Sequence, residues 1–348
     1  MSSFSRRDFL RFLMSLSVAG ISSYLSSCNP MASAPTNLPT MSVDPTKGMN
    51  TPSGVSTEPS APSADPTATQ AVLPSSNSAY LAAARGGAVD PFELTQRAIS
   101  AVGGIARYVK PGSDVIVKPN ICNAYHSFEY ASTTNPAVVA AIVALCLDAG
   151  AGRVRVMDFP FGGKAQNAYE TSGIAGAVEA AGGQMELMNS LKYREVVIPN
   201  AMALKKTEVY ADIFNADTVI NVPIAKHHSG AKLTLGMKNL MGVILNRGAL
   251  HANGLHRSIV DLSTVVKPHL TVIDATRILV ANGPTGGSLN DVRQMDTVIA
   301  SADVVAADAY AATLFNMTGA DIEYIRLADQ LGLGTMNLNS IEIETIDA

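Results

Sequence analysis

The amino-acid sequence predicts one α/β domain in which a largely parallel β-sheet is flanked by helices. Two observations support this fold class. Between residues 91 and 331, short aliphatic runs alternate with longer segments whose apolar residues recur at helical spacing, a pattern typical of parallel sheets. The aliphatic runs contain few polar residues, as expected for strands that are buried on both faces.

The first predicted elements are a helix over residues 91–108 and a strand over residues 114–118. The second helix, over residues 136–149, has a proline at its first turn and Asn135 as its expected N-cap. The other predicted strands cover residues 154–157, 184–188, 218–222, 270–273 and 297–300, and the other predicted helices cover residues 172–181, 303–315 and 321–331. The order of the strands in the sheet cannot be deduced from this pattern.

Residues 1–28 indicate an export signal. Arg6 and Arg7 precede a weakly apolar run over residues 12–25, which is too short for an ordinary transmembrane helix. The paired arginines resemble a twin-arginine signal, with a general secretory signal as the alternative. The run ends in Leu-Ser-Ser-Cys, which resembles a bacterial lipobox, so we expect lipidation of Cys28; ordinary signal-peptidase cleavage is the alternative. The expected location is the outer face of a bacterial membrane or cell envelope, with the lipid as membrane anchor.

Residues 29–78 are predicted to form a disordered linker. Half of these 50 residues are Pro, Ser or Thr, and none is aromatic. Such a composition lacks the apolar surface that a packed core requires. The α/β domain is therefore expected to cover residues 79–348.

Composition excludes two classes of function. The chain has a formal net charge of −4, no Trp and only 5% aromatic residues, which argues against nucleic acid as a partner. Its three cysteines form no C-x-x-C pair, which argues against a cysteine-ligated iron–sulfur cluster.

Polar side chains follow several of the predicted strands. They are Lys118 and Asn120, Asp158, Asn221, and Asp274. Ligands of open parallel sheets bind beyond the carboxyl ends of the strands, so we expect these residues to line a shared crevice. The alternative is that each Asp or Asn caps a local turn.

Residues 218–260 contain no Asp or Glu but hold five of the 25 Lys and Arg residues and four of the six His. This segregation predicts a positive field that favours a small anionic ligand, bound by Lys226, Lys238 and Asn239. A short helix that opens at Gly236 would add an anion site at its N-terminus. A solvated basic loop is the alternative, although its many aliphatic residues favour burial.

The histidines of this segment have two candidate roles. His228 or His251 could act as an acid–base group, or a histidine could bind a divalent metal with Asp158 or Asp274 as oxygen ligands. The adjacent His227 and His228 would point to opposite sides of a strand, so we expect at most one of them in the site.

With these segments identified, residues 89–317 resemble the bacterial family called domain of unknown function 362. The resemblance rests on residues 115–120 (Val-Ile-Val-Lys-Pro-Asn), 133–136 (Thr-Thr-Asn-Pro), 150–158, 221–223 (Asn-Val-Pro), 226–228 (Lys-His-His), 236–242 (Gly-Met-Lys-Asn-Leu-Met-Gly), 274, 282–284 (Asn-Gly-Pro) and 307–309 (Ala-Asp-Ala). It implies that His228 is the matching histidine of the Lys-His-His segment. Many members also carry ferredoxin-type cysteine clusters, which this chain lacks, and the family implies no substrate.

Together these patterns predict an enzyme-like domain that binds a small carboxylate or phosphate. In this hypothesis lysines hold the charge, asparagines orient the ligand, His228 moves protons, and aspartates position bases or bind a cation. The residues concerned are Lys118, Lys226 and Lys238, then Asn120, Asn221 and Asn239, then Asp158, Asp274 and Asp308. The alternatives are a surface lipoprotein that binds an anion without turnover, and a purely structural envelope protein.

Overall fold

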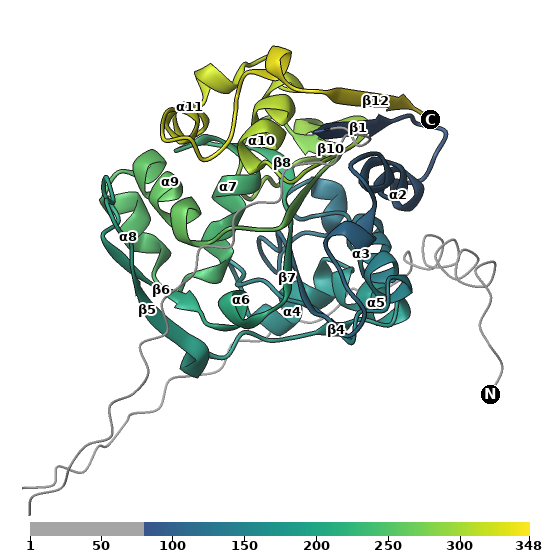
Figure 1. The fold of residues 1–348 in the computed structure, drawn as a ribbon, viewed down its shortest axis with the longest axis horizontal. Helices are drawn as coiled ribbons and strands as arrows, with labels where there is room; N and C mark the ends of the chain where they lie inside the picture. Colours follow the sequence, from purple (N-terminus) through teal and green to yellow (C-terminus); the bar gives the residue numbers. More distant parts are fainter. Residues whose placement is uncertain (1–79) are drawn as a thin grey trace, which may run out of the picture. The chain divides into compact units, whose positions relative to one another are not determined.

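The computed structural model describes residues 80–348, all of which belong to one compact unit (Figure 1). The predicted twin-arginine signal, Cys28 and the predicted linker lie outside the described residues. Within residues 80–348, no helix is both long enough and apolar enough to cross a bilayer.

Ten strands form the main sheet: β1 (Leu81–Arg85), β2 (Asp114–Pro119), β3 (Arg153–Val156), β4 (Gln184–Met185), β7 (Thr218–Val222), β8 (Ile224–His228), β9 (Lys232–Thr234), β10 (Leu270–Leu279), β11 (Val292–Ser301) and β12 (Ile343–Asp347). Their order is β12-β1-β11-β10-β7-β2-β3-β4, and β8 pairs with β10 and β9. A separate two-stranded sheet consists of β5 (Tyr193–Val197) and β6 (Lys206–Tyr210).

Most of the pairs in the main sheet are parallel. Strands β10, β7, β2, β3 and β4 run in one direction, and β8 continues that direction beside β10. The antiparallel pairs are β1 with β11, β10 with β11, and β8 with β9. The predicted fold class, an α/β domain with a largely parallel sheet flanked by helices, is therefore confirmed.

The helices are α2 (Pro91–Ala101), α3 (Pro136–Asp148), α4 (Ala165–Thr171), α5 (Ile174–Ala180), α6 (Asp212–Asn215), α7 (Gly236–Asn239), α8 (Arg247–Ala252), α9 (Leu255–Val265), α10 (Val304–Thr313) and α11 (Glu323–Gln330). Their apolar residues divide into two large clusters, one on each face of the sheet. Val115 and Val117 of β2 belong to the cluster of α2, α3 and α5, whereas Ile116 belongs to the cluster of α7, α9, α10 and α11. This division follows from the alternation of side chains along a strand.

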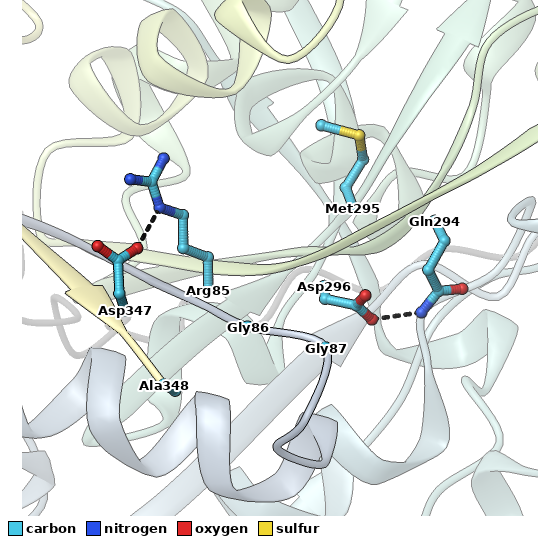
Figure 2. Close-up of a pocket in the computed structure, with 8 residues that line it drawn as sticks. All are labelled: Arg85, Gly86, Gly87, Gln294, Met295, Asp296, Asp347 and Ala348. Carbon is cyan, nitrogen blue, oxygen red and sulfur yellow. Dashed lines mark hydrogen bonds and ion pairs between the residues drawn. The ribbon is translucent and has the colours of Figure 1, made fainter.

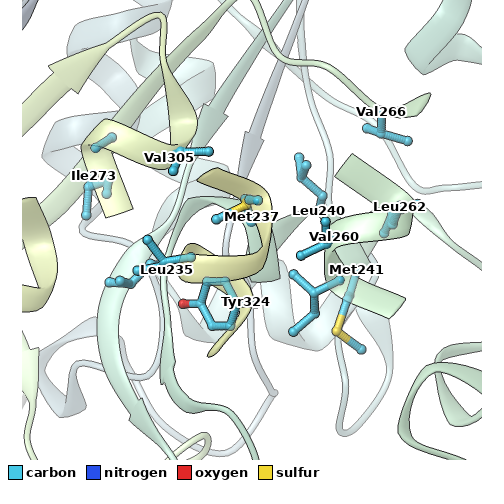
Figure 3. Packing of buried hydrophobic residues seen from close by; sticks show 14 of the residues in the cluster. Leu235, Met237, Leu240, Met241, Val260, Leu262, Val266, Ile273, Val305 and Tyr324 are labelled. Carbon is cyan, nitrogen blue, oxygen red and sulfur yellow. The ribbon is translucent and has the colours of Figure 1, made fainter. Parts of the chain in front are cut away.

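The second of these clusters surrounds the short helix α7 (Figure 3). Met237 of α7 packs there with Val260 of α9, Val305 of α10 and Tyr324 of α11. The aliphatic residues of the acid-free segment are therefore core residues. A solvated basic loop, which was the alternative for this segment, does not describe them.

Several predicted boundaries were wrong. The first helix ends at Ala101 because Gly103 and Gly104 adopt positive φ angles of 96° and 76°, which residues with a side chain rarely adopt. The helix predicted over residues 172–181 is the shorter α5, preceded by the unpredicted α4. Strands β10 and β11 extend well beyond residues 270–273 and 297–300, because they pair with each other along most of their lengths.

Candidate functional site

The candidate site lies at the carboxyl ends of β2 and β7, which are neighbours in the sheet. Lys118 of β2 stands in register with Asn221 of β7, and both side chains are buried. Asp158 follows β3, the other neighbour of β2. Parallel strands therefore bring these three polar residues to one edge of the sheet.

Lys118 is enclosed by three oxygen atoms. Its Nζ donates hydrogen bonds to the carbonyl oxygen of Pro119 at 2.9 Å and to Oδ1 of Asn239 at 3.1 Å. Oδ1 of Asp158 lies 2.8 Å from the same Nζ as an ion pair outside hydrogen-bond geometry, and Oδ2 accepts a hydrogen bond from Ile121 N–H at 2.7 Å. Burial lowers the pKa of Lys118, and the Asp158 carboxylate opposes that effect. Lys118 Nζ thus forms two hydrogen bonds and one ion pair with oxygen atoms of the protein.

Gly242 packs its backbone directly against this ion pair. A Cβ at position 242 would collide with the Asp158 carboxylate and with the Lys118 amine. The site therefore requires glycine at position 242 for close approach rather than for an unusual backbone angle.

Three asparagines connect α7 to the strand ends. Oδ1 of Asn239 accepts hydrogen bonds from Lys118 Nζ and from Asn120 Nδ2, the latter at 2.9 Å. Nδ2 of Asn239 donates to Oδ1 of Asn221 at 2.9 Å, and Nδ2 of Asn221 donates to the carbonyl oxygen of Gly236 at 3.0 Å. The amides thus hold the start of α7 at the edge of the sheet.

Lys226 of β8 is also fully engaged. Its Nζ donates to Oδ1 of Asn120 at 3.1 Å, to the carbonyl oxygen of Ser132 at 2.6 Å and to that of Pro284 at 3.0 Å. The residue is only 1% exposed. It contributes positive charge to the site but has no proton left to donate.

Lys238 differs from the other two buried lysines. It is 7% exposed, and the one hydrogen-bond acceptor near its Nζ is Sδ of Met241 at 3.5 Å; no oxygen atom of residues 80–348 accepts from it. Burial, together with the positive charges of Lys226 and Arg247, lowers the pKa of Lys238 to about 7. An amine in this state exchanges its proton near neutral pH.

Arg247 at the start of α8 was not among the predicted site residues. Its Nη1 and Nη2 donate to the carbonyl oxygens of Phe159 and Pro160 at 2.8 and 2.9 Å, and the guanidinium lies 4.6 Å from the centre of the Phe159 ring. The other N–H groups of Arg247 have no acceptor within residues 80–348. Its position in the acid-free segment was the one sequence signal for a role here.

His228 is held in one tautomer. Its Nδ1 accepts hydrogen bonds from the backbone N–H groups of Gly230 and Ala231 at 3.0 and 3.1 Å, so Nε2 carries the proton. Burial, followed by the charges of Lys238 and Lys226, lowers the pKa of His228 to about 3. The ring of His251 is stacked against the ring of His228, with the two ring centres 6.3 Å apart. Near neutral pH His228 is therefore a neutral hydrogen-bond donor.

The structure does not bring Asp274 into this group. Asp274 lies in the middle of β10 rather than after a strand, because β10 continues to Leu279. Its carboxylate accepts hydrogen bonds from Asn135 N–H at 2.7 Å and from the N–H and hydroxyl of Thr276 at 3.0 and 2.8 Å. These contacts hold the start of α3 against β10.

The N-terminus of α7 is not an open anion site, contrary to expectation. The carboxylate of Asp308, on α10, accepts hydrogen bonds from the N–H groups of Gly236 and Met237 at 2.6 and 3.0 Å. Burial raises the pKa of Asp308 to about 8. A side chain of the domain therefore already fills the position that the sequence suggested for a ligand.

The charges around the site do not balance. Lys118, Lys226, Lys238 and Arg247 influence one another electrostatically, and Asp158 is the one carboxylate that forms an ion pair with any of them in residues 80–348. Unpaired charge in a protein interior is costly, so the basic groups of this region lower the pKa of one another.

No group of three or more His, Cys, Asp or Glu side chains within residues 80–348 is arranged to hold a metal ion. An open cavity of about 440 Å³ lies elsewhere, between the carboxyl ends of β1 and β12 and residues 294–296 of β11 (Figure 2). Arg85, Gln294, Asp296 and Asp347 are among the residues that line it. It contains none of the predicted site residues.

Comparison with known proteins places this chain in a family. A curated relative, the thylakoid-associated protein sll1697 of Synechocystis, is 27% identical over 240 residues, which are 67% of this chain and 72% of the relative. Among solved structures, the chain is similar to the lactate racemase apoprotein from Thermoanaerobacterium thermosaccharolyticum (TM-score 0.41, 14% identity, 65% of this chain) and to a Thermotoga maritima protein (TM-score 0.40, 13% identity, 69% of this chain). The alignments cover 55% and 58% of those two chains. Residues 115–313 match the family described as Domain of unknown function (DUF362), and the chain belongs to that family.

Proposed function

We propose that the domain binds a small carboxylate or phosphate beside Lys238 and acts on it as an enzyme. The observation that carries this proposal is the buried Lys238 amine, which has no oxygen acceptor within residues 80–348 and lies among other cations. An anion would supply both the missing acceptor and the missing negative charge. Charge-assisted hydrogen bonds of this kind are stronger than neutral ones.

The free hydrogen-bond donors favour the same ligand. Lys238 Nζ, the unused N–H groups of Arg247, Nε2–H of His228 and the second Nδ2–H of Asn120 have no oxygen or nitrogen acceptor within residues 80–348. Lys118 and Lys226 each already contact three protein oxygens, so we assign neither of them a hydrogen bond to the ligand. The site therefore offers donors and positive charge, which suits carboxylate and phosphate groups.

Proton transfer is assigned to Lys238 rather than to His228 in this proposal. A group that exchanges protons in catalysis works best when its pKa lies near the working pH. The pKa of Lys238 is lowered to about 7, whereas that of His228 is lowered to about 3. His228 then donates a hydrogen bond from Nε2. Burial also lowers the pKa of His251, so neither histidine offers a protonated ring near neutral pH as a second acid. Binding without turnover is therefore the second candidate function.

The pH dependence of acetate binding tests the proposal. A bound anion favours the charged form of Lys238, so above pH 7 binding must also take up a proton. We expect the affinity for acetate, measured by titration calorimetry, to fall by up to about tenfold for each pH unit between 7 and 9. Below pH 7 it should level off. Proton uptake follows from repeating the titration in buffers of different ionisation enthalpy.

Phosphate at pH 7 is the second ligand in this experiment. Competition between phosphate and acetate would indicate one shared site. Absence of binding by both anions, or an acetate affinity that does not change from pH 7 to pH 9, would contradict the proposal.

We also propose that the chain is exported in folded form and anchored to a membrane through Cys28. The support is the sequence alone: Arg6 and Arg7 before an apolar run that ends at Cys28. Replacing both arginines with lysine should leave the precursor in the cytoplasm, as measured by cell fractionation. Cys28→Ala should release the protein from membranes, and continued membrane attachment of that variant would refute the lipid anchor.

A further inference from the structure

Three lysines are buried at the site, and their contacts divide them into two kinds. Lys118 and Lys226 each contact three oxygen atoms at 2.6–3.1 Å. The one hydrogen-bond acceptor of Lys238 Nζ among the described residues is the sulfur atom of Met241. A lysine needs a free, unprotonated amine to act as a nucleophile, and burial beside other cations favours that form. Burial lowers the pKa of both Lys118 and Lys238, but among these three lysines only Lys238 has no oxygen acceptor within residues 80–348 that would hold its nitrogen.

We propose that Lys238 forms an imine with the carbonyl carbon of a 2-oxo carboxylate. The inference rests on the proposed anion site and specifies its ligand class. It adds a covalent step to binding and identifies the atom that carries out that step, Nζ of Lys238.

The step is balanced without an oxidant or a second substrate. The lone pair of Nζ attacks the carbonyl carbon, and the carbonyl oxygen takes up a proton to give a carbinolamine. Loss of this oxygen as water leaves a carbon–nitrogen double bond to Lys238. Because the pKa of Lys238 is lowered to about 7, a substantial fraction of the amine is neutral near pH 7.

The charges around Lys238 explain why the carbonyl compound should carry a carboxylate. A protonated imine would add a cation beside Lys226 and Arg247, which already disfavour positive charge at this position. A carboxylate on the adjacent carbon offsets that charge and can accept hydrogen bonds from the free N–H groups of Arg247. His228 Nε2–H provides a donor for an oxygen of the ligand. A simple ketone lacks this compensation.

Trapping of the imine by reduction with cyanoborohydride tests the inference on the full-length chain. Pyruvate is the probe, acetone is the matched ketone without a carboxylate, and acetate is the matched carboxylate without a ketone. Reduction with cyanoborohydride in the presence of pyruvate should give one stable adduct per chain by intact mass, and peptide mapping should place it on Lys238. Acetone should give no such adduct, and excess acetate should suppress the adduct formed by pyruvate.

Two substitutions of Lys238, with Lys267→Met as the control, separate the effect of the amine from the effect of the charge. Lys238→Met should lose the adduct, whereas Lys267→Met, which removes an exposed lysine, should retain it. Lys238→Arg keeps a cation that cannot form an imine, so it should still bind acetate without forming an adduct.

Each failure has a distinct meaning. Acetate binding without a pyruvate adduct would overturn the imine and leave the proposed anion site standing. Absence of both acetate binding and the adduct would overturn both. Adducts spread over exposed lysines, or retained in Lys238→Met, would show that Lys238 has no special reactivity and would also overturn the imine.

Discussion

Replacing Lys238 with methionine should weaken anion binding and stabilise the fold in the same variant. The methionine fills a similar volume beside Met241 but carries no charge. Loss of a charge-assisted hydrogen bond typically costs about 1.5–3 kcal/mol, so acetate affinity at pH 6–7 should fall by roughly ten- to a hundredfold. Removal of an uncompensated buried amine should raise the free energy of unfolding by about 1–3 kcal/mol.

The pH dependence of this stability gain has a definite sign. The pKa of Lys238 is lowered on folding from its ordinary value of 10.5 to about 7. Between these values the unfolded chain holds a proton that the folded chain lacks, so wild-type stability rises with pH across this range. The advantage of Lys238→Met should therefore be full below about pH 7 and shrink as the pH rises toward 10.5.

Urea unfolding at several pH values measures this effect, and Lys267→Met is the control because Lys267 is exposed. A Lys238→Met variant that binds acetate normally would contradict the proposed site. A variant that is less stable than wild type at pH 7 would show that the Lys238 amine stabilises the unliganded fold.

Replacing Asp158 with asparagine should give the largest loss of stability. The variant removes the carboxylate that lies 2.8 Å from Lys118, while Lys118 stays buried at 1% exposure. Breaking one side of a buried ion pair typically costs about 3–5 kcal/mol, because the remaining charge is left without compensation. The amide oxygen of the new side chain can still accept a hydrogen bond from Ile121 N–H, so the backbone contact is conserved and the loss reflects the charge.

A matched control is available at the surface. Glu195 and Lys206 pair at 2.8 Å with side chains 56% and 64% exposed, so Glu195→Gln should change the unfolding free energy far less than Asp158→Asn does. Urea denaturation of both variants at pH 7 makes the comparison. Equal effects of the two substitutions would mean that Asp158 does not compensate a buried charge.

Local patterns in the sequence determined the α/β class and about half of the helices and strands of residues 80–348. The strand over residues 114–118 and the helix that starts after Asn135 were predicted nearly to the residue, because the aliphatic run of β2 and the N-cap of α3 are local features of the sequence. The acid-free segment predicted Lys226, Lys238 and Asn239 as site residues, because a shortage of acids is visible in composition alone, and their role in binding stays a prediction. Family membership, too, was predicted from ordered motifs.

Contacts between distant segments decided the rest. Strands β10 and β11 proved longer than predicted because they stabilise each other by antiparallel pairing, which periodicity cannot reveal. Asp308 and Asp274 looked equivalent to Asp158 in the sequence, yet the first two accept backbone hydrogen bonds and only Asp158 meets a lysine. Lys118 was predicted from its place at the end of a strand, and Lys226 and Lys238 were predicted from the acid-free segment. Only the fold gives oxygen partners to Lys118 and Lys226 and leaves Lys238 without one among the described residues. The chemistry of an amine depends on its burial and its partners, and both are properties of tertiary structure.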